Sequence, residues 1–202
     1  MSTGTTRYHH GDLRAALLSE AEAMIGEGGA ESVTMREIGR RVGVSRAAPY
    51  RHFQDKSSLL VAVAAIGFER LGERLRAVGA AAPGASVDRF RRMGAEYVCF
   101  AVENPARYRL MYGKEAVTRV DHPELREAAN ELFELLVEVI EAQQRSGHLE
   151  RQDARARAYV AWSAVHGLAS LLIDHQILTD VDVESLIDQT TGTLLDGMRA
   201  NH

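Results

Sequence analysis

Hydrophobic positions recur every three or four residues along most of the chain, and almost no segment alternates with period two. This spacing is the signature of amphipathic helices, so the pattern predicts an all-α protein. A first helix is expected from Gly11 to about Ile25, because Leu17, Ala21 and Met24 share one face. A group of glycines ends it (Gly26, Gly28 and Gly29).

Three further helices follow in quick succession. Thr34 and Glu37 have the spacing of a capping box, which predicts a short helix from Met35 that stops at Gly43. Ser45 is a good N-cap for a third short helix through about Phe53, in which Pro49 falls near the first turn and removes at most one hydrogen bond. Asp55 can cap a long fourth helix from Lys56 to about Val78.

The remainder of the chain is also predicted to be helical. After a loop from Gly79 to Gly84, amphipathic or apolar segments predict helices over Val87–Glu103, Ala106–Tyr112, Glu124–Arg145, Asp153–Leu178 and Val183–Met198, with an irregular stretch before His122 and Pro123. A chain of 202 residues can bury a sizeable core. We therefore expect an N-terminal three-helix domain followed by a C-terminal helical bundle.

The second and third predicted helices have the spacing of a helix-turn-helix. Gly39 is a small residue where two helices must approach closely, and Gly43 can take the left-handed conformation that a tight turn needs. Val44 is the apolar residue just after the turn, and Ser45 starts the next helix. In a helix-turn-helix the first helix braces the second, whose N-terminal residues enter the major groove of DNA.

Charge supports this interpretation only locally. The chain has a net charge of −4, yet the window from Arg36 to Lys56 holds six basic residues against two acidic ones. A basic patch on an acidic body suits a protein that contacts phosphate at one end only, although a solvated helix face would give the same pattern. For Arg40 and Arg41 both interpretations stay open.

Other function classes find little support. Cys99 is the only cysteine, which excludes an intrachain disulfide, and the eight histidines lack the close pairing of zinc sites. No nucleophile–base pair, phosphate-binding glycine loop or carboxylate cluster indicates an enzyme, so we expect no catalytic residue, metal or cofactor. Without a signal peptide or a membrane span, a cytoplasmic protein is expected. A helical ligand sensor that no longer binds DNA is the remaining alternative.

The stretch from Thr34 to Leu60 resembles the N-terminal module of the TetR family of bacterial regulators. The most diagnostic part is Tyr50-x-His52-Phe53-x-x-Lys56-x-x-Leu59, which other helix-turn-helix families lack. The resemblance covers roughly residues 10 to 60. Gly39 stands where the family more often has alanine. Pro49 replaces a commoner threonine or isoleucine, and this proline would narrow the range of base sequences that the third helix can recognise.

The resemblance implies roles for individual residues. Arg46 and Ala47, at the start of the third helix, would meet base edges, since arginine can bind guanine O6 and N7 together and a methyl can contact the thymine methyl. Pro49 would add an apolar contact. Five polar residues would instead contact phosphate (Thr34, Ser45, Tyr50, His52 and Lys56). Tyr50 could equally belong partly to the core, where Phe53 is expected.

The resemblance also implies a division of the chain. Residues 10–56 would form the DNA-binding domain, continuing into the fourth helix to about residue 70, and residues 57–202 would bind an effector and form a homodimer through the last two helices. The protein would be a repressor released from a palindromic operator by a small molecule. Because the fourth helix runs from the DNA-binding domain into the C-terminal domain, a ligand that changes its tilt would change the spacing of the two reading helices.

The sequence Trp162-Ser163-Ala164-Val165-His166-Gly167 resembles a Trp-x-x-x-His-Gly signature of one TetR subgroup. Trp162 and His166 share a helix face, where they either line a ligand pocket or form a core pair with His166 hydrogen-bonded internally. A set of further residues either lines a cavity or is ordinary core (Tyr97, Phe100, Tyr108, Met111, Tyr112 and Phe133). Because such cavities are mostly apolar, an apolar or aromatic effector is expected.

Overall fold

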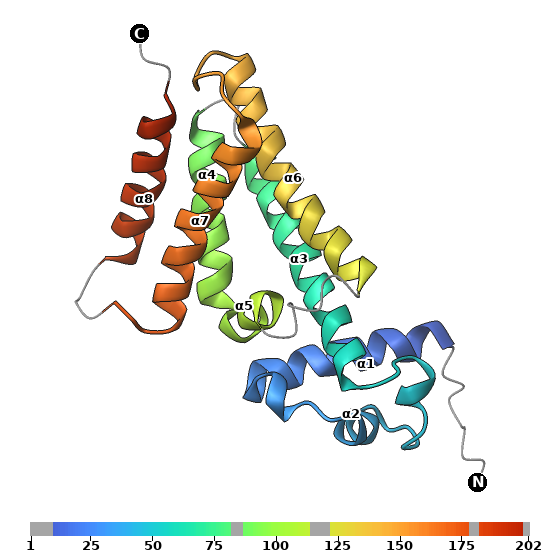
Figure 1. Ribbon diagram of the computed structural model, residues 1–202. Coiled ribbons are helices and arrows are strands. Elements are labelled where there is room, and N and C mark those ends of the chain that lie inside the picture. The colour runs from blue at the N-terminus through green and yellow to red at the C-terminus, as the bar shows by residue number, and fades with distance from the viewer. Residues whose placement is uncertain (1–9, 82–86, 114–121, 178–181, 200–202) are drawn as a thin grey trace. The chain divides into compact units, whose positions relative to one another are not determined.

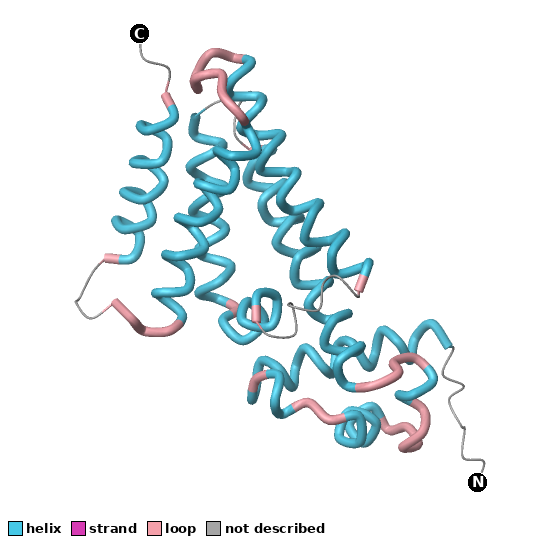
Figure 2. Tube along the Cα trace, viewed as in Figure 1, coloured by secondary structure: helices cyan, strands magenta, loops and turns pink. Residues whose placement is uncertain are grey.

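The computed structural model describes residues 10–81, 87–113, 122–177 and 182–199. Throughout these ranges the regular elements are helices, in agreement with the predicted all-α class (Figures 1 and 2). In the same ranges, no helix combines the length and apolar character needed to cross a membrane. The chain divides into two compact units, one formed by Met1–Ile66 with Ala106–Leu125 and the other by Gly67–Pro105 with Arg126–His202.

The first unit is built around α1 (His10–Gly28) and α2 (Met35–Val42), with the short 3₁₀ helices η1 (Ala30–Ser32) and η2 (Pro49–Arg51) between and after them. Its core is apolar, as the helical spacing predicted, and includes Leu17, Ala21, Met24, Ile25, Val33, Met35, Ile38, Phe53 and Leu59. Also in this unit is most of α5 (Pro105–Tyr112).

Helix α3 (Lys56–Ala80) is one continuous helix whose residues belong partly to each unit. Asp55 caps its start, because its carboxylate accepts from the Ser58 amide at 2.8 Å while the Ser58 hydroxyl accepts from the Asp55 amide at 3.1 Å. The cap at Asp55 and the start at Lys56 are as predicted from the sequence.

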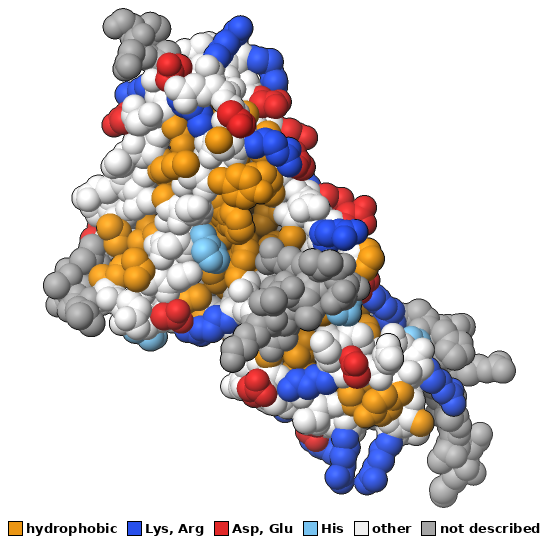
Figure 3. All heavy atoms as spheres, viewed as in Figure 1, with side chains coloured by type: hydrophobic (Ala, Val, Ile, Leu, Met, Phe, Trp, Pro, Cys, Tyr) orange, Lys and Arg blue, Asp and Glu red, His pale blue; other side chains and the backbone are white. Residues whose placement is uncertain are grey.

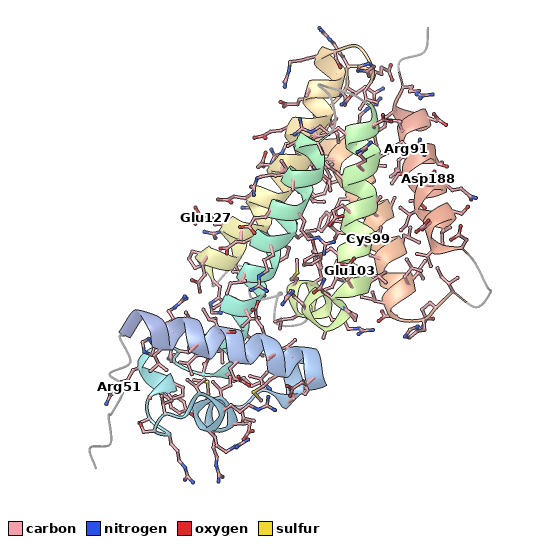
Figure 4. The ribbon with its side chains drawn as sticks, turned by 180° about the vertical axis from the view of Figure 1, so that it is seen from behind. Arg51, Arg91, Cys99, Glu103, Glu127 and Asp188 are labelled. Atoms are coloured by element: carbon pink, nitrogen blue, oxygen red, sulfur yellow. The ribbon has the colours of Figure 1, made fainter. Side chains whose placement is uncertain are left out.

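In the second unit, α4 (Val87–Glu103) packs against α7 (Ala154–Ile173) and α8 (Val183–Met198). Gly94 permits the close approach of α4 to α8, because a Cβ there would lie 2.7 Å from the Thr191 methyl carbon. Arg91 on α4 also pairs with Asp188 on α8 at 3.0 Å (Figure 4). Helix α6 (Pro123–Arg145) ends before Gly147, whose φ of 79° is the left-handed conformation expected of a helix-ending glycine.

The C-terminus of α8 is held by a buried arginine. Arg157, on the first turn of α7, donates to the Met198 carbonyl at 2.7 Å and pairs with the Glu150 carboxylate at 3.1 Å. The Glu150 amide donates to the same carbonyl at 3.0 Å. A cation at the C-terminal end of a helix also interacts favourably with the helix dipole.

Helix α1 extends to Gly28, beyond the Gly26 expected to end it, and two other predicted helices differ more from the structure. The expected α-helix from Ser45 to Phe53 is a turn followed by η2, held mostly by i→i+3 bonds from Ala48 to Ser45 and from Arg51 to Ala48. Pro49 has no N–H to donate to Ser45, so the regular α-helical ladder does not form there. The helix expected to reach Leu178 ends at Ile173, and His175 has a φ of 52°. The loop expected from Gly79 begins later, because α3 includes Gly79 and Ala80. Residues 82–84 of that loop, residues 114–121 before His122, and Leu178 lie outside the described residues.

Candidate nucleic-acid interface

The turn between α2 and η2 has the geometry expected of a helix-turn-helix. The Thr34 hydroxyl accepts from the Glu37 amide at 3.2 Å and so caps α2, and Gly43 ends the helix with φ 78° and ψ 29°. Gly39 is buried, and a Cβ there would lie 3.3 Å from Pro49 Cγ. A larger side chain at 39 would therefore push the segment after the turn away from α2.

Because of this close packing, Pro49 does not have the expected role of an apolar contact with a base. The ring is buried against Gly39, so in this conformation it offers no surface to a base. Its place in the first unit is as a packing residue that sets the position of Arg46 and Ala47, which are both exposed.

The basic residues of the window separate into two groups. Arg40 is held by the Glu37 carboxylate at 2.9 Å, and Arg41 by Glu20, Glu27 and Glu37 at 3.1, 2.9 and 3.3 Å. In contrast, Arg36, Arg46 and Arg51 are exposed and have no carboxylate partner among the residues that the structure describes. Basic side chains project from the α2 side of the unit (Figure 3), and Arg51 points away from its surface (Figure 4).

The arginines also control the ionisation of the glutamates. The hydrogen bond from Arg40, with a further one from Arg41, lowers the pKa of Glu37 to about 2. The hydrogen bond from Arg41 lowers the pKa of Glu27. Both carboxylates therefore stay charged at more acidic pH than an isolated glutamate would. At neutral pH they neutralise Arg40 and Arg41, so these two arginines contribute less to the basic surface than the sequence indicates.

The five residues expected to contact phosphate lie at different exposures. Thr34 and Ser45 are exposed, and Tyr50 is 56% exposed, which removes the alternative that its ring belongs to the core. His52 is half-buried. Lys56 lies at the start of α3, where its ammonium group is 3.4 Å from the Glu31 carbonyl and 3.9 Å from the Glu31 carboxylate.

A polar cluster joins α4 and α7 in the second unit. The buried Tyr97 hydroxyl on α4 accepts from Trp162 Nε1 at 3.0 Å and lies 3.2 Å from His166 Nδ1. A neutral His166 with its proton on Nε2 accepts from this hydroxyl. Trp162 and His166 are half-buried, so each combines an internal hydrogen bond with a face that reaches solvent.

Aromatic rings continue from this cluster across α6 and α7. The Phe133 ring centre lies 4.5 Å from that of Tyr159 and 6.3 Å from that of Trp162, and the Arg155 guanidinium is 5.5 Å from Phe133. Hydrophobic side chains gather on this face of the second unit, with a histidine beside them (Figure 3). Of the remaining expected pocket residues, Phe100 is buried in the second unit, and Tyr108, Met111 and Tyr112 belong to the first unit.

Two matches to known families decide which proteins the chain is related to. Residues 17–63 match the bacterial regulatory proteins of the tetR family, and residues 90–194 match the tetracyclin repressor-like C-terminal domain. The second match alone covers half of the chain. The chain belongs to the TetR family. It is therefore a DNA-binding transcriptional regulator, and not an enzyme.

Individual relatives agree with the TetR fold. A protein of unknown function from Rhodococcus sp. RHA1 is 30% identical with a TM-score of 0.84, over 96% of this chain and 100% of the other. A bacterial regulatory protein of the tetR family from Rhodococcus RHA1 has a TM-score of 0.69 at 19% identity, over 94% and 98% of the two chains. The nucleoid occlusion factor SlmA of Vibrio cholerae serotype O1 is 29% identical over 114 residues, which are 56% of this chain and 57% of that relative. The chain thus matches just over half the length of this curated relative.

Sequence reasoning about the TetR module missed two residues of the exposed basic surface. Arg36, on the first turn of α2, and Arg51, in η2, were counted in the basic window but given no contact of their own. Arg36 and Arg51 differ from Arg41 in that no glutamate of α1 pairs with them, whereas Glu20 and Glu27 of α1 pair with Arg41. Residues 20 and 27 lie one helical heptad apart, so a search for acids at that spacing on the preceding helix would have found Glu20 and Glu27.

Proposed function

We propose that the protein is a cytoplasmic homodimeric repressor that binds a palindromic operator and is released from it by a small molecule. The observation that carries this proposal is the exposure of Arg46 and Ala47 directly after the Gly43 turn. At this point of a helix-turn-helix, side chains reach the edges of bases in the major groove.

Arg46 is the main base-reading residue of the proposal. Its guanidinium is exposed and not paired to a carboxylate among the described residues, so two of its donors are available to guanine O6 and N7. The methyl of Ala47 contacts thymine. Phosphates are bound by Arg36 and Arg51 together with the polar candidates Thr34, Ser45, Tyr50, His52 and Lys56, which fix the orientation of the unit without reading sequence.

The homodimer forms through α7 and α8. Tyr159, Val160 and Leu171 of α7 are 54, 58 and 47% exposed, an unusual concentration of apolar surface on one helix. Glycines of the two helices (Gly167, Gly192 and Gly197) have no heavy atom within 4 Å of a Cβ built on them. Glycine is unfavourable within a helix, and the close approach of a second copy would account for its use at these places.

The effector site of the proposal is the cluster of Tyr97, Trp162 and His166 with Phe133 beside it. Aromatic rings with a few hydrogen-bonding groups suit an apolar or aromatic ligand. A ligand that favours a different tilt of α3 would change the spacing of the two reading segments in the dimer, which must lie about 34–36 Å apart to fit successive major grooves. A coupling free energy of about 1–3 kcal/mol is enough for such a switch.

The DNA-reading role is tested by comparing Arg46→Ala with Arg40→Ala on a duplex selected from a random library. Loss of a bidentate contact to guanine lowers affinity by about 1–3 kcal/mol per site and relaxes the preference at one base position. Arg40 is also exposed but is already held by Glu37, so its removal should leave the base preference unchanged. Equal effects of the two variants on the selected sequence would contradict the proposed role of Arg46.

A further inference from the structure

Pro49 is held in the first unit through both its ring and its carbonyl. A Cβ built on Gly39 would lie 3.3 Å from Pro49 Cγ and 3.7 Å from Pro49 Cδ, so the ring comes this close to α2 because residue 39 is glycine. The Pro49 carbonyl accepts from the amides of His52 and Phe53, both at 3.0 Å, and the Phe53 side chain is buried in the core. Pro49 is therefore fixed to α2 and to the core at once.

The segment around Pro49 winds with about three residues per turn. The Ala48 amide donates to the Ser45 carbonyl at 3.0 Å, and the Arg51 amide donates to the Ala48 carbonyl at 3.2 Å. An α-helix would instead need an amide proton on residue 49 for the Ser45 carbonyl, and proline has none. Ala48 also has φ −63° and ψ −44°, a conformation that a following proline disfavours. The contact of the ring with Gly39 thus holds a winding that local preference opposes.

This winding determines where Tyr50 lies relative to Arg46. In an α-helix, a residue four places further on returns to within about 40° of the same direction. With three residues per turn, it ends about 120° away. Tyr50 is exposed, and Arg51, which follows it in η2, points away from the surface of the unit (Figure 4). Tyr50 is therefore turned away from the side of the segment that presents Arg46.

We infer that the contact between Gly39 and Pro49 determines the sequence specificity of DNA binding. It confines base reading to Arg46 and Ala47 and leaves Tyr50 to the phosphates. Gly39 and Pro49 are positioning residues in this account, because they act on DNA through other side chains. The inference rests on the proposed DNA binding, and it adds which residues of the segment after the turn read bases and why the others do not.

The first test is Tyr50→Ala in the wild-type background, by selection of the full chain against a random duplex library and titration of the selected duplex. Tyr50 is 56% exposed, so the substitution should leave the fold intact. Loss of a hydrogen bond to phosphate should lower affinity by about 10-fold or more, whereas the selected base preferences should be unchanged. A changed base preference at any position would show that Tyr50 reads a base and would overturn the inference.

The second test is Pro49→Ala, which restores the amide that an α-helix needs at this position. Tyr50 should then turn towards the side of Arg46, and the selected motif should gain a base preference that Tyr50→Ala removes in this background only. Gly39→Ala combined with Pro49→Ala should give the same gain, since the new methyl fills part of the space that the ring leaves. Pro123→Ala is the matched control, because it replaces an exposed proline at the first residue of α6 and should keep the wild-type motif.

The effects of the two substitutions on affinity should not be independent. Gly39→Ala alone sets its Cβ against the Pro49 ring and should weaken binding, but in the double variant the ring is absent. The coupling should amount to about 2- to 150-fold in affinity. Independent effects, together with the wild-type motif in both Pro49 variants, would overturn the inference. Failure of the wild-type protein to select any motif is a different result, because it refutes the proposed DNA reading and the inference with it.

Discussion

Replacing Gly167 with alanine should have opposite effects on the stability of the single chain and on the stability of the proposed dimer. A Cβ at this position of α7 would meet no heavy atom of the chain within 4 Å. Alanine is more favourable than glycine within a helix by about 1 kcal/mol. Within one chain, the substitution should therefore raise the free energy of unfolding by up to about 1 kcal/mol.

The dimer should respond in the opposite direction. Gly167 lies four residues before Leu171 and seven after Val160, so it shares a helix face with these exposed apolar residues. An extra methyl in a close helix–helix contact costs about 1–3 kcal/mol, and two-fold symmetry introduces it twice. A total of about 2 kcal/mol or more corresponds to at least about a 25-fold increase in the dimer dissociation constant.

Sedimentation equilibrium over a dilution series measures this constant directly. Gly26→Ala is the matched control, since Gly26 lies within α1 and a Cβ there also meets nothing within 4 Å. The control should gain stability without affecting dimerisation. If Gly167→Ala dissociates no more readily than Gly26→Ala, this face of α7 is not in close contact with a second copy.

Three further predictions concern stability. Thr34→Ala should lower the stability of the first unit by about 0.5–2 kcal/mol through loss of the α2 cap, whereas Thr34→Ser should retain it, as followed by amide exchange of residues 35–42. Arg157→Leu should lower the free energy of unfolding by about 2–4 kcal/mol, because it removes a charged hydrogen bond to a buried carbonyl and a partly exposed ion pair. Arg157→Lys should restore part of this free energy. Urea unfolding followed by the fluorescence of Trp162 measures both variants. Because the pKa of Glu37 is lowered from 4.5 to about 2, its contribution to stability is complete above about pH 4.5 and is lost as the pH falls through 2. Glu37→Gln should therefore lose less stability than the wild-type protein in acid unfolding across that window, and an equal loss would contradict the lowered pKa.

Local signals in the sequence predicted most of the helices. The cap at Thr34 and the left-handed glycine at 43 defined α2 from both ends, and Asp55 defined the start of α3. Each of these signals acts within one turn of backbone, which is why the sequence alone was sufficient. The same reasoning was wrong for the segment after the turn, where Pro49 removes a donor and its ring packs on Gly39, so that a 3₁₀ helix forms instead of an α-helix.

Features that depend on contacts between distant residues could not be predicted. The i, i+4 spacing placed Trp162 and His166 on one face, but nothing local indicates that Tyr97, some 65 residues earlier, joins them. The sequence likewise shows six basic residues near the turn and not which of them are neutralised, because the glutamates that hold Arg41 come mainly from another helix.

The central claim is that the exposed segment after the Gly43 turn reads DNA sequence as part of a dimer. Selection of the purified protein against a random duplex library at two salt concentrations tests it most directly. We expect enrichment of a palindrome whose half-site centres lie about one helical turn (10–10.5 base pairs) or a multiple of it apart, and the same motif at both salt concentrations. Binding that enriches no sequence and vanishes as salt rises would mean that the protein contacts only phosphates, and would contradict a base-reading role of Arg46 and Ala47.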